Sequence, residues 1–173
     1  MEERNRCGWS VPDPVSVKYH DQEWGVPVHD DRKQFEFLVL ESAQAGLSWL
    51  TILKRRDAYR RLYAGFDPEL VAGFDEDRIE TMLQDAGIIR NKQKIMSTIY
   101  NAEEFQRVKA EAGSFQKWLD SLDKSNNYSY VVKRLSSRFK RVGPGSASIF
   151  LWSVGEDLKW DSTLFDKTPK KLA

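Results

Sequence analysis

The stretch LVLESAQAGLSW, residues 38–49, decides how this sequence folds. Its first half reads as an apolar helix that runs to about Gln44, and Gly46 breaks that helix. Ser48 can then cap a second helix directly after the break. Glu41 stands in the middle of the apolar half, where a carboxylate without a partner is costly. It could pair with a nearby arginine, cap a helix end, or belong to a functional site.

Helical patterns extend in both directions from this stretch. Asp30 or Asp31 can cap the first helix, and Gly65 ends the second. Further helices are predicted over residues 68–74, 75–87, 91–112, 114–122, 128–137 and 146–155. No convincing alternating strand pattern appears, so we expect an all-α fold, a compact bundle of helices joined by short turns.

Length and composition indicate one soluble globular domain. The chain has 173 residues, of which 40% are hydrophobic and 31% charged, and it contains no apolar run long enough to span a bilayer. We expect a single domain over residues 1–173, with an irregular lead-in (1–29), a hairpin and following helix (139–155) and a polar tail (159–173). One cysteine excludes an internal disulfide framework. No signal-peptide pattern is present, so we expect a cytoplasmic location.

A basic zone covers residues 124–155, which contain six basic side chains and no acidic one, although the net charge of the chain is only +1. This charge run is either a solvated helix face or a nucleic-acid footprint. Within it, RVGPGSA (residues 141–147) has the pattern of a helix-hairpin-helix element. Gly143 and Gly145 allow close approach of a DNA backbone, and N–H groups at the next helix start can hold a phosphate oxygen. The alternative is an ordinary turn between helices.

The lead-in contains candidates for a metal site and for an aromatic pocket. Cys7 and His20 could form half of a structural zinc site, but zinc needs about four ligands, and the chain has only one further histidine and no further cysteine. A buried thiol and a hydrogen-bonded imidazole are the simpler alternative. Trp9, Tyr19 and Trp24 could line a pocket for a flat ligand or pack the core.

Four motifs follow one another in a single register along the first half of the chain. They are CGW (7–9), YHDQEWG (19–25), LESAQAGLSWLTILKRR (40–56) and QDAGIIRNKQKI (84–95). Together they resemble the bacterial 3-methyladenine DNA glycosylase I family, and the resemblance returns at FKRVG (139–143), where that family has its hairpin. The resemblance implies an all-α bundle of the helix-hairpin-helix DNA glycosylase type, with the base pocket between helical halves.

The resemblance also implies a role for Glu41, which would face the extruded base and accept hydrogen bonds from the adenine edge. Trp49 would stack on that base, while Tyr19 and Trp9 would line the same pocket. The hairpin residues expected to hold the DNA backbone are Lys140, Arg141, Gly143 and Gly145.

The function implied by the resemblance is DNA base-excision repair of alkylation damage. The enzyme would be a hydrolase that cleaves the N-glycosidic bond of 3-methyladenine in alkylated double-stranded DNA, with water as the nucleophile and no lyase step. We expect a monomer without a required cofactor. Two alternatives stay open: a glycosylase for a different alkylated base, and a non-catalytic helix-hairpin-helix relative that recognises distorted DNA.

The sequence departs from the family in two places that bear on the site. Family members close a zinc site with a His and a Cys near the C-terminus, whereas this chain keeps Cys7 and His20 without those partners. We therefore expect no structural zinc. Ser16 stands where many members have an aromatic residue, which would leave one wall of the pocket more open and is the reason to consider another base.

Overall fold

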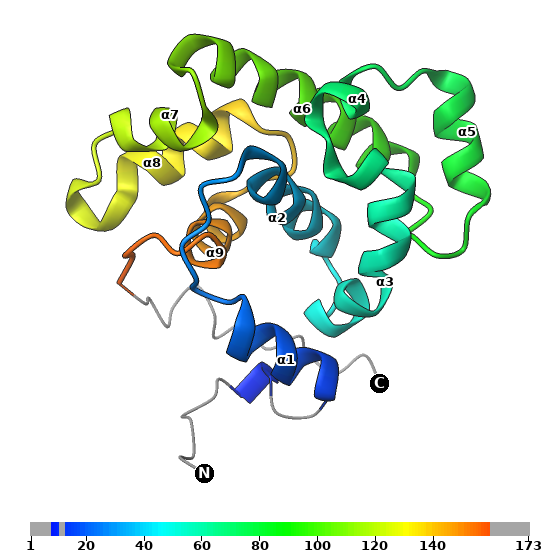
Figure 1. The fold of residues 1–173 in the computed structure, drawn as a ribbon, viewed down its shortest axis with the longest axis horizontal. Helices are drawn as coiled ribbons and strands as arrows, with labels where there is room; N and C mark the ends of the chain where they lie inside the picture. The colour runs from blue at the N-terminus through cyan, green and yellow to red at the C-terminus, as the bar shows by residue number, and fades with distance from the viewer. Residues whose placement is uncertain (1–7, 11–12, 160–173) are drawn as a thin grey trace.

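The computed structural model describes residues 8–10 and 13–159, except for the side chain of Trp9. Every regular element in that part of the chain is a helix, which confirms the predicted all-α fold (Figure 1). The elements in chain order are η1 (Gly8–Ser10), α1 (Pro14–Gln22), α2 (Asp31–Gln44), α3 (Trp49–Leu62), η2 (Ala64–Phe66), α4 (Pro68–Ala72), α5 (Glu76–Gln84), α6 (Lys92–Ala112), α7 (Phe115–Ser121), α8 (Ser125–Arg138) and α9 (Pro144–Ser153). Over these residues, no helix combines the length and apolar character needed to cross a membrane.

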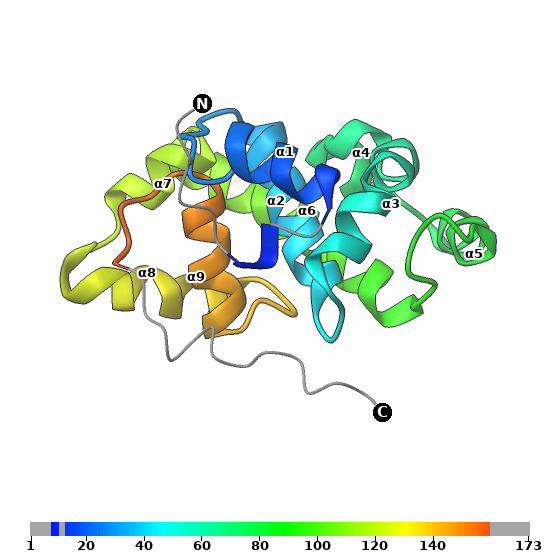
Figure 2. The same cartoon turned by 90° about the horizontal axis from the view of Figure 1, so that it is seen from below.

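Helix α2 lies at the centre of the molecule. Its residues 34 to 43 are all buried, as expected for a helix that is surrounded by others. Helices α3, α6, α7 and α9 pack against it. In Figures 1 and 2, α3 to α5 lie on one side of α2 and α7 to α9 on the other. This central position buries both glutamates of the helix, Glu36 and Glu41.

Side-chain caps start the two helices that carry the predicted site. Asp30 accepts a hydrogen bond from the Lys33 N–H (2.9 Å) at the start of α2, and Ser48 accepts one from the Thr51 N–H (3.2 Å) at the start of α3. Between the helices, Gly46 adopts a φ of +82°, a conformation that favours glycine. The break and the caps are those predicted from the sequence.

The prediction of an irregular lead-in over residues 1–29 is wrong for helix α1. Asp13 caps this helix by accepting a hydrogen bond from the Val15 N–H (2.9 Å), and Pro14 follows in the first turn, where its missing N–H costs nothing. The prolines suggested an irregular chain, but an Asp-Pro pair is itself a helix start. The helix predicted over residues 128–137 is α8. It begins three residues earlier, at Ser125, and the three residues that follow Ser125 have positive φ values.

The segment after α1 packs directly on the end of α9. The Val28 N–H donates to the Val154 carbonyl at 2.9 Å, and Gly155 adopts a φ of +84°. A Cβ atom on Gly155 would lie 2.5 Å from the Pro27 backbone, so only glycine fits there. The expected roles of Cys7, of the Trp9 side chain and of the tail beyond Lys159 lie outside the described residues.

Candidate active site

Glu41 on α2 is the buried acid that the sequence singled out. Its side chain is only 2% exposed, and its Oε1 lies 3.5 Å from the hydroxyl of Ser153 at the end of α9. Its Oε2 is buried and has no hydrogen-bond partner among the residues that the structure describes. None of the lysines and arginines in that part of the chain pairs with it, and it lies in the last turn of α2, where the free backbone groups are carbonyls that a carboxylate cannot cap. The arginine pair and the helix cap are therefore both wrong explanations for Glu41.

The environment of Glu41 favours its neutral form. Burial raises the pKa of its carboxyl to about 8, and the Ser153 hydroxyl offsets only part of that shift. Ser153 has a single proton, which it can donate to the Ile149 carbonyl at 2.9 Å. A protonated Glu41 can in turn donate to the Ser153 oxygen. A positive charge placed beside Glu41 would reverse the balance and favour the carboxylate.

The rings of Tyr19 on α1 and Trp49 on α3 lie against each other. Their ring centroids are 5.3 Å apart at an interplanar angle of 57°. Phe37 and Trp24 contact Tyr19 as well, with centroids at 6.2 and 6.3 Å. Burial, and then the charge of Glu41, raise the pKa of the Tyr19 hydroxyl, so the two groups are close in space. The structure thus brings together three of the four predicted pocket residues, from three different helices.

Trp49 occupies the first position of α3, directly after its capping serine. The loop before it is fastened by Lys94 of α6, whose Nζ donates to the carbonyls of Ala43 and Ala45, both at 2.9 Å. A cation at the C-terminal end of α2 also suits the helix dipole. Like Glu41 Oε2, Trp49 Nε1 is buried without a hydrogen-bond partner in the described part of the chain. The site therefore contains one unused acceptor and one unused donor.

Two surface pockets lie away from these side chains. One, of about 580 Å³, is lined by Lys140 and Arg141 together with residues of α5 and α6, and the other, of about 410 Å³, includes His29 and Asp67. Glu41 lines neither of them. Because the rings of Tyr19 and Trp49 touch, a flat ligand that stacks between them would first have to separate them.

The predicted hairpin connects α8 to α9 and is held by Asn101 of α6. The Asn101 Oδ1 accepts from the Lys140 N–H at 2.7 Å, and its Nδ2 donates to the Lys140 carbonyl at 2.9 Å. The Lys140 Nζ lies 3.8 Å from the centre of the Tyr100 ring. Arg141 is exposed, has a φ of +60° and donates to the Gln93 side chain at 3.2 Å. Asn101 was not predicted, because it is distant in sequence from the loop that it holds.

Gly143 and Gly145 leave the start of α9 open to a partner. Gly143 is the N-cap residue and provides no side-chain cap, and Pro144 follows it. A helix leaves its first N–H groups without intrahelical partners, so those of Gly145 and Ser146 are available at this end. A Cβ atom on either glycine would meet no atom within 4 Å. Packing among the described residues therefore does not require glycine at these two positions, whereas close approach of a partner would.

Acidic side chains from outside the basic zone neutralise part of its charge. Arg138 and Lys124 each bind two carboxylates. Lys133, Lys140 and Arg141 are exposed. The positive surface is consequently narrower than the sequence suggested, and two of its three exposed members belong to the hairpin.

Of the two residues considered as zinc ligands, the structure describes only His20. His20 Nδ1 lies 3.2 Å from Asp21 Oδ1, and Cys7 is outside the described range. Among residues 8–10 and 13–159, no group of three or more His, Cys, Asp and Glu is arranged to hold a metal ion. The absence of zinc stays a prediction.

Comparison with known proteins finds a family model that covers most of the chain. The model described as Methyladenine glycosylase matches residues 9–154. The DNA-3-methyladenine glycosylase 1 of Escherichia coli (strain K12) is 47% identical over 110 residues, which cover 64% of this chain and 59% of that protein. The match therefore spans less than two thirds of the length of this relative.

Solved structures share the arrangement of helices. A crystal structure of 3-methyladenine DNA glycosylase I matches with a TM-score of 0.77 at 37% identity, over 87% of this chain and 92% of that chain. A structure of the 3-methyladenine DNA glycosylase I from Staphylococcus aureus, which describes 3-methyladenine recognition by that enzyme, matches with a TM-score of 0.78 at 31% identity, over 87% and 90%. Both matches agree with the all-α fold.

Proposed function

The chain belongs to the methyladenine glycosylase family, and we propose that it is a monofunctional DNA glycosylase that removes 3-methyladenine from alkylated DNA. Family membership confirms the resemblance read from the sequence. One observation carries the proposal: Glu41 is a buried acid without a cation among its described neighbours, and its charge acts on the hydroxyl of Tyr19, whose ring touches that of Trp49.

The chemistry of the substrate explains what such a site has to provide. Adenine alkylated at N3 is a cation while it is attached to the sugar, and it leaves as a neutral molecule. It therefore needs little protonation as a leaving group. The enzyme has to extrude the nucleotide from the duplex and hold a cationic purine next to its cleavable bond. A carboxylate and aromatic faces favour such a base.

Glu41 is the residue that we assign to the charge and the edge of the base. Because its pKa is about 8, the Glu41 carboxyl is mostly neutral near pH 7 when the site is empty. The folded protein therefore does not contain an isolated buried charge at this position. Entry of a cationic purine favours the carboxylate, which can then accept hydrogen bonds from the adenine edge through the unused Oε2. A neutral, undamaged base offers no such charge and gains less.

The aromatic residues are assigned to the faces of the base. Trp49 would stack on it, and Tyr19 and Trp9 would line the same pocket, with the indole N–H of Trp49 available as a donor. Because Tyr19 and Trp49 touch in the empty site, the base would enter between side chains that move apart. Water would then attack the sugar, without a lyase step.

The hairpin is assigned to the DNA backbone. The N–H groups at the start of α9 and the cationic side chains of Lys140 and Arg141 can bind phosphate oxygens, and glycine at 143 and 145 keeps the approach clear. Such contacts hold the duplex in register without reading its sequence. The expected partner is double-stranded alkylated DNA.

The test is the release of free base from duplex DNA treated with a methylating agent, measured by chromatography of the products. We expect the wild-type protein to release 3-methyladenine. Glu41→Gln removes one charge-assisted hydrogen bond, worth about 1.5–3 kcal/mol, and should slow release roughly ten- to a hundredfold. Glu80→Gln, the same exchange on the exposed surface of α5, is the matched control and should behave as wild type.

The same assay separates the alternatives. Release of a different alkylated base in place of 3-methyladenine would favour a substrate change connected with Ser16. DNA binding without release of any base would indicate the non-catalytic relative. A folded Glu41→Gln protein with unchanged release would remove Glu41 from the proposed site.

A further inference from the structure

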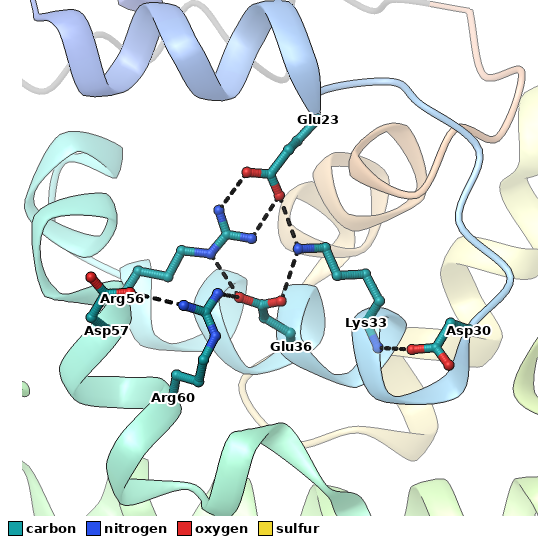
Figure 3. A network of polar contacts seen from close by, with 7 residues as sticks. All are labelled: Glu23, Asp30, Lys33, Glu36, Arg56, Asp57 and Arg60. Atoms are coloured by element: carbon teal, nitrogen blue, oxygen red, sulfur yellow. Dashed lines mark hydrogen bonds and ion pairs between the residues drawn. The ribbon is translucent and has the colours of Figure 1, made fainter.

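A closed ring of ion pairs occupies the junction of α1, α2 and α3 (Figure 3). Arg56 Nη1 and Nη2 bind the two carboxylate oxygens of Glu23 at 2.8 and 2.7 Å, and Arg56 Nε binds Glu36 at 2.7 Å. Lys33 Nζ closes the ring through Glu23 at 2.9 Å and Glu36 at 3.0 Å. We call Glu23, Lys33, Glu36 and Arg56 the ionic clasp. Glu23 directly follows α1, and the other three residues belong to α2 and α3, so the clasp joins all three helices.

The clasp is neutral in sum and strongly held. Although burial opposes ionisation, hydrogen bonds from Arg56 and Lys33 keep the pKa of the Glu23 carboxyl at about 2. The same two cations hold the pKa of Glu36 below its usual value against burial. The planar guanidinium forms two parallel bonds to Glu23, which fix orientation as well as distance. A lysine at position 56 could not reproduce that geometry.

The cations of the clasp also contact the aromatic rings next to the proposed pocket. The Arg56 guanidinium carbon lies 5.8 Å from the centre of the Tyr19 ring and 6.0 Å from that of Phe37. Lys33 Nζ lies 5.2 Å from the Phe37 ring. Tyr19 and Phe37 contact each other at 6.2 Å. Arg56 therefore touches both the chain end that anchors α1 and the ring that α1 contributes to the site.

Helix α1 is tied to α3 at both of its ends, and only one end carries Tyr19. At the N-terminal end, Lys54 pairs with Asp13 at 2.9 Å, and the Lys54 side chain is 55% exposed. At the C-terminal end, the Glu23 N–H donates to the Tyr19 carbonyl at 2.9 Å, so the clasp residue and the pocket residue share one helical turn. A shift of Glu23 would carry Tyr19 with it.

We infer that Arg56 is a positioning residue for the base pocket: by holding Glu23 and Glu36 together, it sets where Tyr19 lies relative to Glu41 and Trp49. The inference rests on the proposed function, because the pocket in question is the one assigned to the alkylated base. Arg56 itself does not contact the reacting atoms. It keeps the wall that Tyr19 forms at a fixed distance while the base enters.

A network that only stabilises the fold is the alternative, and the two roles have different consequences. If Arg56 only stabilised the fold, its replacement would reduce base release to a similar extent whether or not Tyr19 is present. A positioning role acts through the Tyr19 ring, so its loss should matter only while that ring is present.

The first arm of the test compares base release from methylated duplex DNA at saturating enzyme. Arg56→Met should slow release roughly ten- to a hundredfold, because a small misplacement of a pocket wall is enough for that effect. Arg56→Lys keeps the positive charge, so it is the variant to use if Arg56→Met does not fold, and it should give an intermediate loss of base release.

Arg60→Met is the matched control. Arg60 also binds Glu36, at 3.1 Å, but its side chain is 46% exposed against 12% for Arg56, and within the described residues it contacts no aromatic ring. The control should stay within about twofold of wild type.

The second arm asks whether Arg56 acts through Tyr19. Tyr19→Ala is made alone and together with Arg56→Lys. The inference predicts that Arg56→Lys causes little further loss of release once Tyr19 is gone. An equal loss with and without Tyr19, or an Arg56→Lys protein as active as wild type, would overturn it.

The third arm does not depend on activity. Amide hydrogen exchange of the last turn of α1 should be faster in Arg56→Lys than in wild type, and unchanged in Arg60→Met. If the wild-type protein released no base, the proposed function would fail, but this arm would still report on the clasp. Unchanged exchange at the end of α1 in Arg56→Lys would show that Arg56 does not hold the helix and would overturn the inference.

Discussion

Helix α2 carries two buried glutamates that the protein treats in opposite ways. Glu36 is 5% exposed and receives Arg56 at 2.7 Å, Lys33 at 3.0 Å and Arg60 at 3.1 Å, so its pKa lies below the usual value. Glu41, 2% exposed on the same helix, has Ser153 at 3.5 Å and no cation among its described neighbours, and burial raises its pKa to about 8.

The difference indicates that Glu36 has a structural role and that Glu41 is available to bind a ligand. The chain has the means to neutralise a buried carboxylate, because it uses three cations at Glu36. Glu41 has no such cation in the described part of the chain. An unpaired buried acid lowers the stability of the fold, and such groups are found most often at functional sites. A cationic base would supply at Glu41 the partner that the protein itself supplies at Glu36.

The largest effect should come from removing the acid that is paired. Glu36→Gln leaves Arg56, Lys33 and Arg60 with one carboxylate fewer in a buried setting, so the free energy of unfolding should fall by about 3 kcal/mol. Urea denaturation at pH 7 measures it. Asp57→Asn, which also removes a partner of Arg60 but from a side chain that is 96% exposed, should leave stability unchanged. A Glu36→Gln protein as stable as wild type would remove the contrast between the two acids.

The unpaired acid should instead make stability depend on pH. The folded pKa of Glu41, about 8, lies above its ordinary value of 4.5, so the folded protein keeps a proton that the unfolded chain releases between those values. The stabilising contribution is complete below pH 4.5 and is lost as pH rises through 8. Glu41→Gln lacks this dependence, so its stability relative to wild type should increase by about 1.5 kcal/mol between pH 6.5 and pH 8. Urea denaturation of both proteins at the two pH values measures it, and parallel pH profiles would contradict the raised pKa.

The hairpin tests whether DNA affinity is independent of both acids. Gly145→Leu adds a side chain in open space, so the protein should fold normally, while a phosphate can no longer approach the start of α9. Affinity for DNA should fall about tenfold for all sequences alike, and the salt dependence of binding should become shallower. Fluorescence anisotropy with labelled duplexes measures both quantities. Glu41→Gln should bind undamaged DNA as wild type; a sequence-selective loss would place the DNA path elsewhere.

The smallest expected effect is that of a chelator on Tm. It tests whether a metal ion, in addition to the ionic clasp, fixes the position of α1. A zinc ion bound through Cys7 and His20 would fasten the helix that carries Tyr19 and would make the ionic clasp redundant. We expect no stoichiometric zinc in the purified protein and no change of Tm in strong chelator, because the sequence has one cysteine and two histidines, and a structural zinc needs about four such ligands. About one zinc per chain by elemental analysis, with a lower Tm after its removal, would contradict this.

Local signals in the sequence were sufficient for most of the fold. Asp30, Ser48 and Asn91 were each expected at helix starts, and each accepts a hydrogen bond from a backbone N–H there. Helix α1 was missed because nearby prolines outweighed the cap signal of Asp13. A cap and its helix lie within a few residues of each other, which is why a pattern along the chain can reveal them.

The sequence predicted only those site residues that stand out from their immediate sequence neighbours or belong to a family motif. Glu41 is conspicuous because it interrupts an apolar helix, and the family resemblance adds Tyr19 and Trp49 to it. Ser153 and Arg56 carry no such mark, because their contacts join residues of different helices. Nothing in the sequence indicated that Arg56 would bind Glu36 and leave Glu41 unpaired. Which acid receives the arginine is decided by how the helices pack, a property that a linear pattern does not contain.

The most direct test is the titration of the two glutamates of α2 in one sample. Glutamate labelled with ¹³C at the side-chain carboxyl gives a separate signal for each residue, and Glu41→Gln and Glu36→Gln identify the two signals by their disappearance. We predict that the Glu41 signal titrates near pH 8 in the protein without DNA, while the Glu36 signal titrates below pH 4.5. A Glu41 signal that titrates at or below pH 4.5 would mean that a cation already accompanies this carboxylate, and would contradict the claim that it is kept for the base.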